Sequence, residues 1–160
     1  LVEARIPVIA SALNDLPATF EMLGATQSNI GRMKDAGVQV AIGMINDRDS
    51  HQLRYTTQYA GNIVSLQFVP GATGLTWDEA FAAISSVPAD IMGVGDRFGS
   101  LKAGKAADVV IWDGDPLELS TAATTVFIDG VEQPLTNRQN RLRDRYARPT
   151  EGDLPKAYDR

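Results

Sequence analysis

The sequence predicts an α/β segment followed by a β-rich segment, and three features of its pattern carry that prediction. Two short apolar runs, 6–12 and 38–45, flank a stretch with helical spacing, which is the strand–helix–strand order of a parallel sheet. After Gly93 the chain changes to short β-like runs separated by Gly and Asp turns. The pair Asp129-Gly130 follows one of these runs, and this pair favours the two-residue type I′ turn of a β-hairpin.

The first 45 residues support the α/β part element by element. The apolar run 6–12 is typical of a buried parallel strand. A helix is expected over 17–36, since Pro17 suits a first turn and apolar residues recur at threes and fours. Those apolar residues are Phe20, Leu23, Ile30 and Met33. Gly37 is the expected C-cap of this helix, and 38–45 is the second buried strand.

Helices are also expected between the second strand and the β-rich segment. The stretch 52–66 has apolar residues at helical spacing. Thr76 is followed three residues later by Glu79, which is the pattern of a capping box at the start of a helix. A further short helix is expected over 89–92. Trp77 is expected to be a core or boundary aromatic, as is Trp112 in the β-rich segment, rather than a platform for substrate.

The β-rich segment contains one clear strand and one clear hairpin. The strand is 109–112, and the hairpin joins 125–128 to 131–132. Three carboxylates lie at turns and strand boundaries, where a structural role is expected: Asp108, Asp113 and Asp115. A last helix is expected over 137–146, inside a polar, Arg-rich tail.

Composition excludes several kinds of chemistry. The chain has 160 residues and no cysteine, so disulfides, thiolate metal sites and cysteine nucleophiles are excluded. Its one histidine, His51, cannot by itself supply the ligands of a catalytic zinc site. The net charge is −5, and an acidic chain argues against a nucleic-acid binder. No apolar run approaches the roughly 20 residues that span a bilayer.

A polar run follows the second strand directly, from Asn46 to His51. An α/β barrel keeps its chemistry at the C-terminal ends of its strands, so this run occupies the position of a functional loop. The alternative is structural: a carboxylate such as Asp47 can also serve in a turn or a helix cap, and His51 can be a polar residue at a helix start.

The most specific stretch of the sequence is residues 98–116, within the longer run GVGDRFGSLKAGKAADVVIWDGDPLE, residues 93–118, which is followed by TTVFIDGVEQPL, residues 124–135. Taken from the residues alone, it describes tight turns and a strand pair and implies no catalytic chemistry. It also resembles the C-terminal end of the metal-dependent amidohydrolases of the imidazolonepropionase and prolidase-like group. The resemblance covers essentially residues 1–135.

The resemblance implies a fold: the last strand–helix units of a TIM-type (β/α)8 barrel, joined to part of a small composite β-sandwich domain. Residues 1–92 would be the barrel portion, 93–135 the sandwich segment and 136–160 the Arg-rich tail. The runs 6–12 and 38–45 would then be barrel strands seven and eight.

Two strands cannot close a barrel, so we expect a partner for them. That partner would be a missing N-terminal barrel half or another copy of the chain. The chain opens at Leu1 with residues that are typical of a helix end, which adds to the expectation of sequence upstream.

The resemblance also implies a site. In the family, strand eight ends in Gly-Thr-Asp, and the Asp binds metal and takes a proton from the attacking water. Here the strand reads Gly43-Met44-Ile45, so Asp47 is the best substitute for that catalytic Asp, with Asp49 and His51 as second choices. Asn46 and His51 are the candidate substrate-binding residues.

The resemblance further implies a divalent metal, expected to be zinc, in the full-length enzyme. The family's other metal ligands are histidines on strands that this chain does not contain, so no metal ligand is assigned here.

Two functions remain open at this point. The first is a C-terminal fragment of an enzyme that hydrolyses a non-peptide or dipeptide-like C–N bond of a small-molecule amide with metal-activated water, and that is not competent alone. The alternative is a catalytically degenerate relative that acts as a binding or assembly module, because no Asp follows Gly43 in the family register. A periplasmic location is slightly favoured over a cytoplasmic one.

Overall fold

The computed structural model describes residues 1–12, 17, 19–45 and 53–147. Their order of elements follows the predicted change from α/β to β. The helices and strands are β1 (Val8–Ala10), α1 (Asn29–Asp35), β2 (Val40–Ile42), α2 (Thr56–Ser65), α3 (Trp77–Ala83), α4 (Ser86–Ile91), β3 (Val109–Trp112), β4 (Ala123–Ile128), β5 (Val131–Gln133) and α5 (Arg138–Tyr146). Three 3-10 turns add to them: η1 (Phe20–Met22), η2 (Leu53–Tyr55) and η3 (Leu66–Phe68).

Strands β1 and β2 form a parallel pair, with Val8 opposite Val40 and Ala10 opposite Ile42. Helix α1 connects them, so the predicted strand–helix–strand unit is confirmed. Both strands are shorter than the apolar runs that predicted them. All three residues of β2 are buried, as expected of a parallel strand covered on both faces.

The helix expected over 17–36 is wrong in its first half. Among the described residues of this range only η1 and α1 form, and Phe20 and Leu23 are 87% and 68% exposed rather than facing the core. Gly24 disfavours a helix interior, and the hydroxyl of Thr26 accepts a hydrogen bond from the backbone N–H of Ser28 at 3.2 Å. These local alternatives turn the chain between η1 and α1, so the helix begins only at Asn29.

Helix α1 ends as predicted at Gly37, whose φ of +85° lies in the left-handed region. The N–H of Val38 donates to the carbonyl of Met33, and the N–H of Gly37 donates to that of Lys34, both at 2.9 Å. This pair of hydrogen bonds is the Schellman motif, and it satisfies carbonyls that the helix end leaves unpaired. The chain is thereby reversed into β2.

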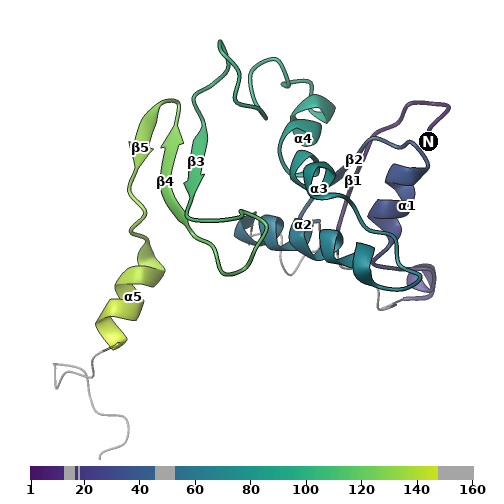
Figure 1. The fold of residues 1–160 in the computed structure, drawn as a ribbon, viewed down its shortest axis with the longest axis horizontal. Helices are drawn as coiled ribbons and strands as arrows, with labels where there is room; N and C mark the ends of the chain where they lie inside the picture. Colours follow the sequence, from purple (N-terminus) through teal and green to yellow (C-terminus); the bar gives the residue numbers. More distant parts are fainter. Residues whose placement is uncertain (13–16, 18, 46–52, 148–160) are drawn as a thin grey trace, which may run out of the picture.

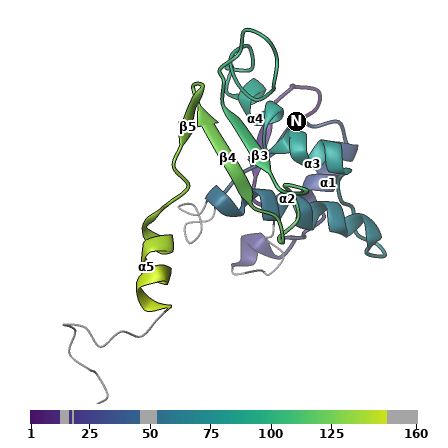
Figure 2. The ribbon, with the colours of Figure 1, turned by 60° about the vertical axis from the view of Figure 1, so that its left-hand side comes forward.

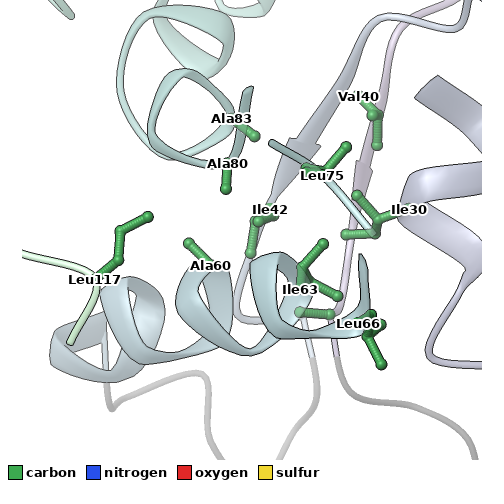
Figure 3. Close-up of a cluster of buried hydrophobic side chains, with 11 residues drawn as sticks. Ile30, Val40, Ile42, Ala60, Ile63, Leu66, Leu75, Ala80, Ala83 and Leu117 are labelled. Atoms are coloured by element: carbon green, nitrogen blue, oxygen red, sulfur yellow. The ribbon is translucent and has the colours of Figure 1, made fainter. Parts of the chain in front are cut away.

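The hydrophobic core lies between β2 and the helices (Figure 3). Its largest fully buried side chains are Ile30 of α1, Ile63 of α2 and Leu75, which precedes α3. Ala80 and Ala83 bring α3 close to β2 because their side chains are small. The expected helix 52–66 is confirmed as α2, which η2 and η3 extend at its two ends.

Two glycines allow α1 and α2 to lie close to the backbone of other segments around the core. A Cβ on Gly31 of α1 would lie 2.4 Å from the carbonyl oxygen of Thr73. A Cβ on Gly61 of α2 would lie 2.2 Å from that of Leu117, which is itself buried in the core. Any larger residue would have to push these segments apart.

The second half of the chain forms an antiparallel sheet in the order β3-β4-β5. The predicted hairpin is confirmed, because Asp129 and Gly130 between β4 and β5 both have positive φ, 51° and 77°. The carboxylate of Asp108 accepts from the N–H of Asp129 at 2.8 Å, and the N–H of Gly130 donates to Ala107 at 3.0 Å. This turn is therefore tied to the chain segment that enters β3.

The antiparallel sheet lies beside the helical layer (Figure 1). The indole N–H of Trp77, at the start of α3, donates to the carboxylate of Asp115 at 2.9 Å, and the ring stacks on Phe81. Asp113 and Asp115 also accept hydrogen bonds from the backbone N–H groups of Ala122 and Leu117. The structural roles predicted for these carboxylates are confirmed, and Trp77, which is 38% exposed, is a boundary aromatic rather than a core one.

Helix α5 projects away from the rest of the molecule (Figures 1 and 2). Asn137 caps it through hydrogen bonds from the N–H groups of Gln139 and Asn140. A side-chain hydrogen bond of 2.7 Å connects it back to Arg54 through Gln139. Among the described helices, none is long and apolar enough to cross a membrane.

The predicted capping box begins α3. The N–H of Glu79 donates to the Thr76 hydroxyl, and the Glu79 carboxylate accepts from the Thr76 N–H at 3.0 Å. The same carboxylate lies 3.7 Å from the Lys34 ammonium of α1. The hydrogen bonds from Thr76 lower the pKa of Glu79 below its ordinary value.

Glu79 is expected to make stability depend on pH. Because its pKa is lowered on folding, its contribution is present above the ordinary value of 4.5 and is lost as pH falls through the folded-state value. The melting temperatures of the wild type and of Glu79→Gln should therefore differ most near neutral pH and converge in acid. Thermal unfolding followed over that range checks this, and a pH-independent difference would contradict it.

The close approach at Gly61 predicts a cost for any side chain there. Gly61→Ala should lower the free energy of unfolding by about 1–3 kcal/mol, because the new methyl group collides with backbone. Gly24→Ala is the matched control, since nothing lies within 4 Å of its Cβ position. Urea unfolding of both variants measures the difference, and equal stabilities would show that the Leu117 segment can move freely.

Candidate functional site

The carboxyl ends of β1 and β2 lie at the same edge of the parallel pair. Ala10 is opposite Ile42, and the N–H of Gly43 donates to the carbonyl of Ala10 at 2.9 Å. The segments that leave the two strands, beginning at Ser11 and Gly43, therefore start side by side. In α/β proteins this edge is where ligands and catalytic groups are placed. We refer to it below as the carboxyl edge.

The predicted site residues follow the carboxyl edge in sequence but are not themselves described. Asn46, Asp47, Asp49 and His51 lie outside the described residues, so their predicted roles stay predictions. The last described residue after β2 is Ile45, and the next described residue is Leu53.

A polar cavity of about 430 Å³ opens beside the end of β1. Four polar residues contribute to its lining: Ser11, Glu21, Thr26 and Asn29. The remaining lining residues are Ala10, Met22, Gly24 and Ala25. The cavity thus lies between the carboxyl edge and the turns that replace the first half of the predicted helix.

Sequence reasoning missed the residues of this cavity. A continuous helix over 17–36 would have made Glu21 and Asn29 ordinary helix-surface residues. The signal that could have found them is the run Gly24-Ala25-Thr26, which combines a helix-disfavouring Gly with a Thr able to bond its own backbone. A break at that point turns the preceding residues back over the end of β1.

Successive hydrogen bonds build the wall of the cavity. The N–H of Met22 donates to Thr19, that of Ala25 to Met22, and that of Asn29 to Thr26, at 2.9–3.1 Å. Ser28 is 4% exposed, and its hydroxyl accepts from the backbone N–H of Thr73 at 3.0 Å. This contact anchors the turn to the segment before α3.

Glu21 supplies a negative charge at the cavity. The side chain of Thr19 and the backbone N–H of Glu21 itself hydrogen-bond to the carboxylate, and they hold its pKa below the ordinary value of 4.5. The group is exposed, so the effect of this shift on stability is small, but Glu21 is ionised at neutral pH. It belongs to neither of the ion pairs seen among described residues, Lys34–Glu79 and Arg143–Asp144.

The described ranges contain no group of three or more His, Cys, Asp or Glu side chains that could hold a metal ion. The described residues therefore do not fit a metal site by themselves. Glu21 is one carboxylate among neutral groups, which is fewer ligands than a zinc or magnesium site requires.

The stretch 93–118, which carries the family resemblance, makes structural contacts. The ammonium of Lys105 donates to the carbonyls of Gly95 and Phe98 and, at 2.7 Å, to the hydroxyl of Ser100. One side chain thus holds the loop that leads from α4 to β3. Together with the bond from Asp108 to the hairpin turn, this explains why the motif needs these residue types without any catalytic role.

Comparison with known proteins identifies the family of the chain. The profile of the amidohydrolase family matches residues 17–132, which is most of the chain. The chain belongs to the amidohydrolase family. The resemblance drawn from the sequence is thereby confirmed.

Individual relatives are similar over parts of their length. The chain is 47% identical over 60 residues to amidohydrolase tasK of Hapsidospora irregularis, covering 38% of this chain and 6% of that protein. It is 35% identical over 100 residues to the imidazolonepropionase of Maricaulis maris, covering 61% of this chain and 23% of the relative.

A solved structure extends the comparison. The crystal structure of an amidohydrolase from Thermotoga maritima MSB8 matches with a TM-score of 0.70 and 29% identity, over 82% of this chain and 32% of that one. This amidohydrolase chain therefore spans about a quarter or less of the two curated relatives and about a third of the solved structure.

Lys105 is expected to carry much of the stability of the loop between α4 and β3. Lys105→Ala should cost about 1.5–3 kcal/mol, because hydrogen bonds from a charged donor are lost at a half-buried position. Lys102→Ala, three residues away and exposed, is the control and should be near neutral. Hydrogen exchange of the Gly95–Ser100 amides should accelerate in the first variant alone; unchanged exchange would reject the role of Lys105.

Proposed function

We propose that the chain is the C-terminal part of a metal-dependent amidohydrolase that hydrolyses a non-peptide or dipeptide-like C–N bond of a small-molecule amide. The observation that carries the proposal is the carboxyl edge: two parallel strands end together, and the chain after β2 continues directly into Asn46 and Asp47. The family membership supports the reaction class. The names of the relatives, an imidazolonepropionase among them, support C–N bonds as the target.

Asp47 is proposed as the catalytic carboxylate. It lies two residues beyond Ile45, the last described residue after β2, and so follows the carboxyl edge closely. A carboxylate there can take the proton of the attacking water and return it to the leaving nitrogen. Asn46 and His51 are proposed to hydrogen-bond the substrate. Asp49 and His51 are the second choices for the residue that takes the proton from the attacking water.

A bound divalent metal, proposed to be zinc, would lower the pKa of a coordinated water toward about 7. The described residues do not supply its ligands, so we propose that most of them belong to the rest of the enzyme. On this proposal the 160-residue chain is not competent alone.

The proposal includes completion of the fold by other chain segments. The arrangement would be the end of a TIM-type barrel, with β1 and β2 as its last two strands, joined to part of a composite β-sandwich formed by β3, β4 and β5. Ile9 of β1 is 39% exposed and Ile45, three residues after β2, is 55% exposed, as expected of apolar residues that another segment would cover. An N-terminal barrel half or a second copy of the chain would supply that cover.

A second candidate function is a binding or assembly module that has lost catalysis. The observation that favours it is the sequence Gly43-Met44-Ile45 at the end of β2. Gly43 is tightly held, since a Cβ there would lie 2.6 Å from the side chain of Ile9. The apolar Met44 and Ile45 then stand where the family pattern has Thr and Asp.

The role of Asp47 is tested by substitution in the full-length protein. Asp47→Asn should lower kcat/KM for hydrolysed amides by about 10²-fold or more, because the general base is lost. Asp35→Asn, at the end of α1 and away from the carboxyl edge, is the control and should keep full activity. An Asp47→Asn enzyme with wild-type kcat/KM would reject the assignment.

Metal content separates the two candidate functions. Elemental analysis of the full-length protein should find about one or two equivalents of zinc or a similar divalent ion, and chelation should abolish hydrolysis, with recovery on readdition of zinc. A folded full-length protein that binds no metal would reject the hydrolase and support the binding module.

A further inference from the structure

The polar cavity beside β1 has a chemistry that the proposed hydrolysis does not use. Its ionised group, Glu21, lies in η1, in the segment that follows β1, whereas Asp47, the proposed catalytic carboxylate, follows β2 in the sequence. The two strands end together at the carboxyl edge. A group bound in the cavity would therefore lie near the reacting bond without taking part in the reaction.

The Glu21 carboxylate has unused capacity for accepting hydrogen bonds. Two oxygens offer about four lone-pair sites, and the contacts that hold the group are the Thr19 side chain and the N–H of Glu21 itself. Glu21 lines the cavity and its side chain is exposed, so these contacts leave lone pairs for a further partner. Ser11, Thr26 and Asn29 add neutral oxygen acceptors around the same space.

The apolar part of the lining suits an alkyl stem. Ala10, Met22 and Ala25 contribute carbon surface beside the polar groups. A long cationic side chain has the same division, since its methylene groups pack on apolar surface while its charged end makes hydrogen bonds. A cavity with one unpaired negative charge, several acceptors and an apolar wall matches that type of ligand.

We propose that Glu21, with Ser11, Thr26 and Asn29, forms a specificity subsite for a cationic nitrogen group, an ammonium or guanidinium on an alkyl chain, in the substrate of this amidohydrolase. The proposal rests on the proposed function, because it places the substrate at the carboxyl edge. Charge-assisted hydrogen bonds to Glu21 would select such substrates over neutral ones of the same shape. Glu21 would act in binding and would not touch the reacting atoms.

The binding test uses pairs of probes that differ in charge but hardly in shape. The first pair is N-acetyl-L-arginine amide and N-acetyl-L-citrulline amide, and the second is N-acetyl-L-lysine amide and N-acetyl-L-norleucine amide. Their affinities for the full-length protein are measured by calorimetry after metal removal by chelation, so that no turnover interferes. The cationic member of at least one pair should bind about two- to fivefold more tightly, as an ion pair with an exposed carboxylate provides.

The variant Glu21→Gln separates the subsite from other sources of charge preference. It keeps the size of the side chain and should bring the two members of the preferred pair to nearly equal affinity. Glu3→Gln, an exposed residue outside the cavity, is the matched control and should leave the preference unchanged. Thermal unfolding confirms that both variants fold, and Glu21→Asp, which retains the charge, should keep a reduced preference.

The outcomes distinguish this proposal from the function on which it rests. Equal binding within both pairs, or a preference that survives Glu21→Gln, overturns the subsite even if the enzyme hydrolyses amides. If the wild type prefers the cationic probe and Glu21→Gln removes that preference, the subsite is supported. This support holds even if the protein binds no metal and hydrolyses nothing. In that last case the hydrolase fails while the binding of cations stands.

Discussion

The parallel pairing of β1 with β2 is the constraint on which the rest of this structure depends. A parallel strand without solvent on either side must be apolar throughout, and Val40, Ala41 and Ile42 are each at most 4% exposed. Such a strand needs helices to cover it, and α1, α2 and α3 contribute small and branched side chains to the core around it (Figure 3). The same pairing brings two chain exits together at the carboxyl edge. The packing of the helices and the position of the carboxyl edge therefore both follow from the pairing of β1 with β2.

The most recognisable part of the sequence and the proposed catalytic residues lie in different segments of the chain. Lys105 and Asp108 satisfy backbone groups of the loop and hairpin, and Asp115 bonds the indole of Trp77 in the helical layer. These contacts preserve the family scaffold whatever happens at the carboxyl edge. The family profile matches residues 17–132, which include these contacts, whereas the proposed catalytic residues follow Ile45 and the proposed subsite lies at the cavity beside β1. A hydrolase and a degenerate relative can share every contact described for residues 93–135.

Some features were predictable because their physical cause is local. The Schellman end at Gly37, the capping box of Thr76 and Glu79, and the type I′ turn at Asp129-Gly130 each depend on a few neighbouring residues. The helix predicted over 17–36 is wrong in its first half, because the spacing of apolar residues gives no indication of a competing turn. Phe20 and Leu23 have the right spacing but no core to face, and Thr26 offers its neighbours a different hydrogen bond. The roles of Asn46, Asp47 and His51 remain predictions, and Glu21 and Asn29 emerged only when the turn replaced the helix.

The sequence by itself determined the order of elements, the family resemblance and the absence of enough histidine for a complete zinc site, because each follows from residue types and their spacing. Only the tertiary structure decided which residues meet. The contacts of Gly61 with Leu117, of Ser28 with Thr73 and of Trp77 with Asp115 join segments far apart in the chain. No local pattern encodes such contacts, since they arise when separate surfaces are buried against one another. The cavity that contains Glu21 has the same origin: a turn anchored by a distant backbone N–H places one carboxylate beside the end of a strand.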